Sequence, residues 1–266
     1  MSEPMMTANP DVLGPLAELE GVGKAARSAR DAVDVLLRDR GQRKVSPEVT
    51  SESLLRGAYA SAVLAGSTAT LDEVRRGEAD PVASGAVRMT TELMALAPHA
   101  DVNPIQVWAR LHQLAAADLA GNPDELGHLR ADHEPVPDDI DGLGPAPSAA
   151  VVWERLSGLA RALTRPSAAP GIVVAAVVHA ELAVLRPFPH ANGLVARAAE
   201  RVVLVARGID RVGATVPEAG HLELRASYAG ALRQYADGGV TGVRDWLLRS
   251  CEVVTLGAER SPLQGS

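Results

Sequence analysis

The chain has 266 residues, of which 47% are hydrophobic and 3% aromatic, and it carries a formal net charge of -7. This length and apolar content allow a large buried core, which excludes wholesale disorder. The negative charge argues against a general nucleic-acid binder, which needs a basic surface. A core with so few aromatic side chains must consist of Ala, Val and Leu, and this composition predicts closely packed helices.

The same composition bears on the compartment. A single cysteine, Cys251, leaves no intrachain disulfide and fits a reducing cytosol. The first ten residues lack the basic and apolar regions of a signal peptide. The longest apolar stretch, residues 171–185, is too short to span a bilayer and contains His179 and Glu181. We therefore expect a cytoplasmic protein with no membrane contact, in which residues 171–185 form the most buried helix.

The first half of the chain reads as consecutive helices. Residues 16–40 space their apolar positions at three and four, which predicts one or two amphipathic helices that end at Gly41. Residues 1–45 are thus expected to be a helical extension, partly flexible and frayed over residues 1–14. Ser46-Pro47 predicts a new helix start, and Asn103-Pro104 predicts another.

The second half contains the one long irregular stretch. Residues 121–148 are rich in Gly, Pro and Asp and have no helical period, which is typical of a functional or disordered segment. Helices resume at Ala149 and Gly171, and two more close the chain before a flexible tail at 258–266. The prediction is one all-α domain over residues 46–257, with Trp108, Trp153 and Trp246 in its core.

The loop after the buried helix is the first candidate site. Pro187 ends that helix because proline has no amide hydrogen and clashes with the preceding turn. A second apolar helix begins near Asn192, and its free amides and dipole favour an anion, which Gly193 would let approach closely. Arg197 lies one turn further on, where it could add a bidentate charge. The alternative is a simple helical corner with Phe188, the only phenylalanine, as a core plug.

Residues 186–197, RPFPHANGLVAR, resemble the signature H-x-F-x-[DE]-G-N-G-R-x-x-R of the Fic (Fido) family. Arg186 falls on the motif histidine, Phe188 on its phenylalanine and His190 on its acidic residue. The remaining positions fall on Ala191, Asn192, Gly193, Leu194 and Arg197. The resemblance implies a Fic-type helical domain whose nucleotide or anion site comprises Arg186, His190, Ala191, Asn192, Gly193 and Arg197.

The resemblance covers about residues 50–250. Residues 110–130 look like the family's L-H-x-x-L helix and P-G-x-x-R element, which precede the flap, a β-hairpin that docks the target segment. It implies an irregular or short-hairpin flap at 127–147, beside the loop, where a partner protein could bind by adding a strand. Ser61, Ala65 and Gly66 fall on the family's inhibitory motif [ST]-x-x-x-E-[GN], with Ala65 in place of its glutamate; the alternative is a small-residue helix contact at 61–66 that matches by chance.

The substitutions weaken the chemistry that the family implies, which is transfer of AMP from ATP to a hydroxyl on a target protein. Arg186 stays protonated and has no acceptor atom, so it cannot act as the motif's general base. His190 is a poor ligand for Mg²⁺, which prefers oxygen. Leu194 removes one phosphate-binding arginine. This pattern predicts a degenerate member that retains the fold without the transfer activity.

Three alternatives remain open from the sequence. The first is an inactive Fic-like protein that binds a protein or a nucleotide, such as ATP, without Mg²⁺. The second is an active nucleotidyl- or phosphotransferase with altered chemistry, in which His190 serves as the base. The third is a purely structural helical protein. No metal site is expected, because His128 and His133 lack further ligands at zinc spacing and His99, His112 and His221 are dispersed.

Overall fold

The structure is a computed structural model that describes residues 11–38, 46–134, 136 and 142–265. Within these ranges the chain forms helices joined by loops and contains no strand, which confirms the all-α class. The α-helices are α1 Val22–Arg38, α2 Pro47–Leu64, α3 Leu71–Arg76, α4 Pro81–Thr91, α5 Leu93–Leu96, α6 Pro104–Ala116, α7 Ala149–Leu163, α8 Gly171–Leu185, α9 Asn192–Ala206, α10 Pro217–Glu223, α11 Arg225–Ala236 and α12 Val240–Glu259. Short 3-10 turns cover Gly14–Glu18, Ala97–His99, Pro123–Glu125 and Pro262–Gly265.

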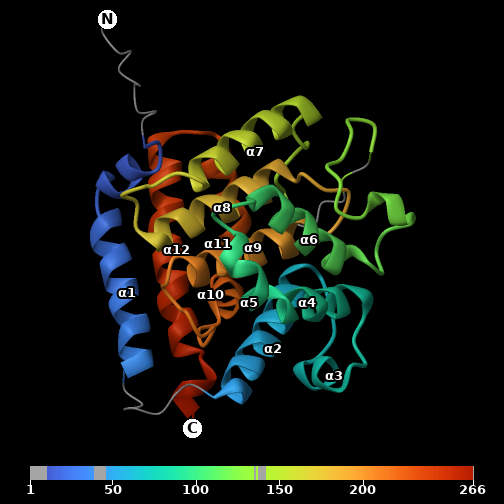
Figure 1. The fold of residues 1–266 in the computed structure, drawn as a ribbon, viewed down its shortest axis with the longest axis horizontal. Helices are drawn as coiled ribbons and strands as arrows, with labels where there is room; N and C mark the ends of the chain where they lie inside the picture. Colours follow the sequence, from blue (N-terminus) through green and yellow to red (C-terminus); the bar gives the residue numbers. More distant parts are fainter. Residues whose placement is uncertain (1–10, 39–45, 135, 137–141, 266) are drawn as a thin grey trace, which may run out of the picture.

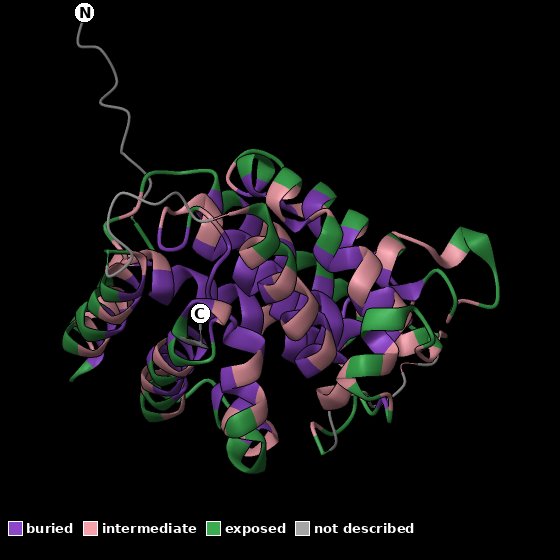
Figure 2. Cartoon of the chain, turned by 90° about the horizontal axis from the view of Figure 1, so that it is seen from below, coloured by how far each residue is buried: buried purple, intermediate pink, exposed green. Residues whose placement is uncertain are grey.

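Helix α8 lies at the centre of the bundle (Figure 1) and is buried except at Gly171 and Glu181. It packs against α9 and α12, with α7 and α11 covering further faces. Its run of Ile, Val and Ala has no polar face, and only a helix covered on all sides tolerates such a run. Helix α9 is buried to the same extent, so the second apolar helix expected from Asn192 is also a core helix. Figure 2 shows the buried residues gathered at the centre of the bundle.

Two helix starts expected from the sequence are confirmed, and each lies at a proline. Helix α2 begins at Pro47 with Ser46 as its N-cap residue, although the Ser46 side chain makes no capping hydrogen bond. Helix α6 begins at Pro104, directly after Asn103. Proline suits the first turn because its missing N–H would be unpaired there in any residue.

The N-terminal extension is part of the helical body from Asp11 onward. Helix α1 lies along α12 (Figure 1) and buries five side chains, including Val22 and Val33. The Asp11 carboxylate accepts hydrogen bonds from the Ser167 hydroxyl and the Ala168 amide, both at 2.8 Å. Most of the predicted frayed and flexible positions, residues 1–10 and 39–45, lie outside the described residues.

Two expectations are wrong. Residues 258–264 of the predicted tail are not loose, because α12 continues to Glu259 and Leu263 after it is only 7% exposed. The Ser261 hydroxyl also donates to the Ala214 carbonyl at 2.7 Å, which anchors the tail. Trp153 is 57% exposed on α7, while Trp108 and Trp246 are core residues as predicted. Helical spacing from apolar neighbours therefore placed two of the three tryptophans correctly.

The flap segment is irregular rather than a hairpin. Residues 127–134, 136 and 142–147 form turns and extended stretches without strand pairing. Of the two forms expected, the hairpin is thus absent from the described part of the segment. In the described ranges, no helix combines the length and apolarity needed to cross a membrane.

Candidate functional site

The loop between α8 and α9 is tied to itself by one asparagine. The Asn192 side chain accepts from the Phe188 amide and donates to the Phe188 carbonyl, both at 2.9 Å. Two residues of the loop have left-handed backbones, Arg186 with φ 45° and Ala191 with φ 57°. Such backbones are uncommon outside glycine and persist only where surrounding contacts hold them. The loop is therefore a rigid corner.

Phe188 anchors this corner in the core, as the sequence predicted. It is 1% exposed, and its ring stacks on His112 of α6 with centroids 4.4 Å apart and planes 8° apart. His112 Nδ1 accepts a hydrogen bond from the Gly127 amide at 2.9 Å, so its proton is on Nε2. Burial lowers the pKa of His112 to about 4, with His190 and His128 as lesser causes. His112, which the sequence did not connect with any other residue, therefore joins α6 to the loop and to Gly127 at the start of the flap segment.

The flap segment lies beside the loop, as the sequence predicted. The Arg130 amide donates to the Pro187 carbonyl at 2.9 Å, and its guanidinium donates to the Arg186 carbonyl at 2.7 Å. Arg186 in turn donates to the Gly144 carbonyl at 2.8 Å. The two ends of the flap segment are thus bonded to the corner through buried arginines, since Arg130 is 4% and Arg186 3% exposed.

Three arginine side chains donate hydrogen bonds to backbone carbonyls of residues 142–147, the flap exit. Gly142 accepts from Arg233 of α11 at 3.1 Å, Gly144 from Arg186, and Pro147 from Arg130 at 2.5 Å. Residues 145 and 147 are prolines and have no amide hydrogen. A row of open donors and acceptors is what strand addition requires. The described flap exit lacks such a row, so it does not support the docking by an added strand that the family pattern suggested.

The side chains of the two motif arginines, Arg186 and Arg197, point in different directions. Arg197 is 1% exposed and donates to the Ser61 hydroxyl at 2.8 Å, the Ser61 carbonyl at 2.9 Å and the Tyr228 hydroxyl at 3.3 Å. It therefore points to α2, whereas Arg186 points to the flap. Of the inhibitory-motif positions, Ser61 contacts Arg197, while Ala65 and Gly66 end α2, with Gly66 at φ 88°. This structure does not bring Arg186 and Arg197 together around one anion.

The remaining candidate positions differ in exposure. Ala191, Asn192 and Gly193 are buried at the amino end of α9. His190 is partly exposed, and its Nε2 lies 3.1 Å from a carboxylate oxygen of Glu125 in the flap entry. A carboxylate at this distance orients the imidazole ring.

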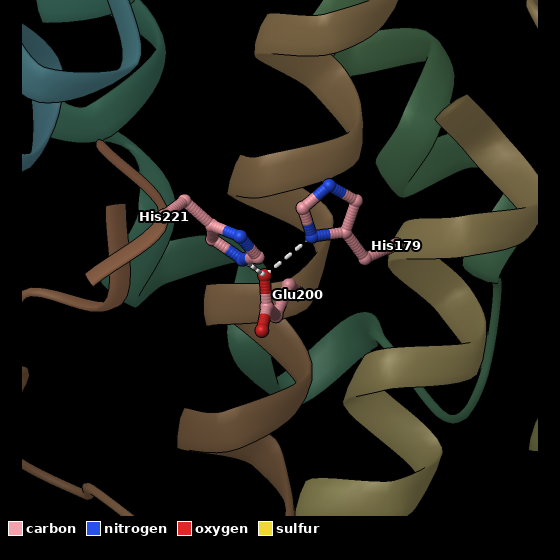
Figure 3. Close-up of side chains that lie close together, drawn as sticks. All are labelled: His179, Glu200 and His221. Carbon is pink, nitrogen blue, oxygen red and sulfur yellow. Dashed lines mark hydrogen bonds and ion pairs between the residues drawn. The ribbon is translucent and has the colours of Figure 1, made fainter. Parts of the chain in front are cut away.

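A second polar group, which the sequence did not reveal, lies deeper between α8, α9 and α10 (Figure 3). One Glu200 oxygen is 2.6 Å from His179 Nδ1 and 2.7 Å from His221 Nε2. Burial lowers the pKa of both histidines, that of His221 to about 3. Burial alone would raise the pKa of the Glu200 carboxyl, but the two imidazoles hold it below its usual range. The group is therefore two neutral histidines that donate to one carboxylate.

The three ligand atoms lie within 4.8 Å of one another, which raises the question of a metal ion. The surrounding contacts do not fit one. Arg249 donates to His221 Nδ1 at 3.1 Å, and a guanidinium can only donate, so the proton of His221 must be on Nε2. A metal would need the lone pair of that same Nε2. The Tyr228 hydroxyl occupies His179 Nε2 at 2.7 Å, and the chain of bonds ends at Arg197.

The helical bundle around the buried pair α8 and α9 is similar in overall fold to solved structures of Fic proteins. A Fic family protein from Desulfovibrio desulfuricans G20 matches with a TM-score of 0.66 and 17% identity, over 97% of this chain and 77% of that one. A fragment of Fic-1 from C. elegans matches with a TM-score of 0.65 and 19% identity, over 92% of this chain and 74% of that fragment.

These comparisons establish that the chain has the Fic-family fold over most of its length. At these identities the likeness concerns the fold alone. No protein-family profile and no curated protein matches the chain by sequence.

Proposed function

We propose that this chain is a Fic-fold protein that does not transfer AMP from ATP to proteins and acts by binding a protein or a nucleotide. The observation that carries the proposal is Arg186 at the position of the motif histidine. Its guanidinium has no acceptor atom for a proton and donates instead to the Gly144 carbonyl. A general base contributes about 10²–10⁴-fold to such reactions, and its loss would leave little transfer.

Arg197 supports the same proposal. In the resemblance it is a phosphate-binding arginine, but here its guanidinium is bonded to Ser61 and Tyr228 and is buried. Releasing a buried guanidinium from its partners is costly, because each buried donor left unpaired costs about 1–3 kcal/mol of free energy. Nucleotide binding at the α9 amino end would rely on Arg186 and the backbone amides of 191–193, with His190 held by Glu125. We expect such binding to be independent of Mg²⁺.

The test combines binding with transfer. ATP, ADP and GTP are titrated calorimetrically with and without Mg²⁺, and labelled ATP is incubated with the chain alone and with a lysate. The proposal expects binding that a chelator does not abolish, and no labelled protein. Label transfer by the unmodified chain would refute it. If none of the nucleotides binds, the function narrows to protein binding or to the purely structural alternative, and capture of a partner by the flap segment 127–147 separates these two.

One observation favours a second candidate, an enzyme with altered chemistry. A carboxylate beside an imidazole is the arrangement by which enzymes orient a general base, and Glu125 lies 3.1 Å from His190. His190 would then take the proton of an attacking hydroxyl or water at its other nitrogen. The test is ATP or GTP turnover by the unmodified chain, by His190→Ala and by Glu125→Gln. The candidate requires turnover that both substitutions reduce, whereas turnover that survives in His190→Ala excludes it.

A further inference from the structure

A cavity of about 340 Å³ lies far from the motif loop, between α1 and the amino end of α8. Its wall combines apolar and cationic side chains. The apolar part comes from Ala26, Pro170, Ile172 and Ile209, and the charged part from Arg27, Arg30, Arg207 and Asp31. Ligand sites of this size are mostly apolar with a few charged groups that orient the ligand. Three guanidiniums against one carboxylate, in a chain of net charge -7, favour an anion.

The guanidiniums differ in how far they are already paired. Arg30 is 3.0 Å from Asp34, and Arg207 is 3.0 Å from Asp101. Arg27 forms no ion pair with any residue that the structure describes. The Nε atom of Arg207 is buried and has no hydrogen-bond partner. Arg27 is therefore the guanidinium of the wall with no competing carboxylate among the described residues, and its charge is the most available to a ligand.

The backbone at the cavity adds positive charge to that of the arginine side chains. Pro170 precedes α8 and offers no side-chain cap to the first turn of the helix. The partial positive charge of a helix amino end therefore adds to that of the arginines. Gly171 lets Arg207 lie close to the first turn of α8, since a Cβ at residue 171 would lie 2.7 Å from the Cβ of Arg207.

We propose that this cavity binds a small amphiphilic anion, a carboxylate or phosphate group on a short apolar body. The arginines hold the charged end, and Ile172 and Ile209 contact the apolar body. The cavity is separate from the motif loop, because Arg207 follows the carboxyl end of α9 and the motif loop precedes the amino end of α9. The fifteen residues of α9 place the two about 22 Å apart. The proposal therefore does not depend on nucleotide binding.

The probes are octanoate and octyl phosphate, which carry the same apolar body on the two head groups, with octanol as the neutral control. Calorimetry of the full chain measures their affinities. We expect at least one of the two anions to bind at least tenfold more tightly than octanol, and the tighter of the two identifies the head group. Octanol binding as tightly as both anions, or no binding by any probe, overturns the proposal.

Three variants test the wall by charge. Arg27→Gln should weaken anion binding about tenfold, because a hydrogen bond between two charged groups is lost. Asp31→Asn should tighten it, since it removes the only carboxylate of the wall. Arg38→Gln is the matched control, because it removes the same charge about 16 Å further along α1. Equal losses in Arg27→Gln and Arg38→Gln would show a general charge effect and overturn the proposal. All three side chains are exposed, and thermal unfolding verifies that the variants fold.

Discussion

Phe188 provides the sharpest test of how the corner is built. It is the only phenylalanine of the chain, it is buried, and it stacks on His112 beneath the loop between α8 and α9. Phe188→Ala removes the ring and leaves a cavity between α6 and the corner. The Asn192 bonds to the Phe188 backbone remain, so the perturbation acts on packing first.

The expected cost follows from burial. A Phe→Ala change in a packed core costs about 3–5 kcal/mol, which includes the lost transfer free energy and the cavity left behind. The stack on His112 places Phe188→Ala in the upper half of that range, because aromatic pairs add about 0.5–1.5 kcal/mol to the burial of their area. With an unfolding entropy of about 2.1 cal/mol/K per residue, a loss of 4 kcal/mol lowers the Tm by about 7 °C.

Urea unfolding followed by circular dichroism measures this change, with Trp153→Ala as the control. Both variants lose one aromatic ring, but Trp153 is 57% exposed and should cost less than about 1 kcal/mol. A cost for Phe188→Ala below about 1.5 kcal/mol, or equal costs for the two variants, would refute the anchoring role of Phe188.

Three further predictions follow from the site. Arg186→His should not restore AMP transfer from labelled ATP, because His190 and Leu194 remain; transfer by this variant would return the chain to the active enzymes. Ser61→Ala should lower the free energy of unfolding by about 1–3 kcal/mol, because it removes the hydroxyl that accepts from Arg197 at 2.8 Å; an unchanged urea midpoint would contradict the role of this bond in joining α2 to α9. Stability should fall as the pH drops from about 6.5, the ordinary pKa of histidine, toward about 4, the pKa of His112 in the fold, because the unfolded chain binds more protons over this range. His112→Phe should reduce that fall without abolishing it, because the buried His179 and His221 also have lowered pKa values; an equally steep fall in the variant, in urea unfolding at several pH values, would contradict a contribution from His112.

The helices and the corner follow from local sequence. Proline at residues 47, 104 and 187 limits where a helix can continue, so the beginnings of α2 and α6 and the end of α8 were predictable to within a residue. The unbroken apolar run 172–178 requires cover on every side, which predicts the central place of the helix 171–185. Phe188 as a core plug follows from the rarity of its type and its position between two prolines. Each of these features depends on residues that are close together in the sequence.

The partners of the polar side chains did not follow from the sequence. Glu200 is 21 residues from both His179 and His221, and Glu125 is 65 residues from His190. Contacts at such separations have no periodic signature, because they depend on how α8, α9, α10 and the flap entry are packed. The same holds for His112, whose role depends on the ring of Phe188 and the amide of Gly127.

The two motif arginines show this division most clearly. The motif spacing placed Arg186 before α9 and Arg197 one turn inside it, and the anion hypothesis assumed that both face one pocket. In the folded chain the left-handed backbone of Arg186 directs its side chain to the flap exit, while Arg197 points across α9 to Ser61 of α2. A guanidinium bonds whichever acceptors the packed helices bring within reach. Sequence specified the arginines and the helices that carry them, and tertiary packing decided which acceptors they bind.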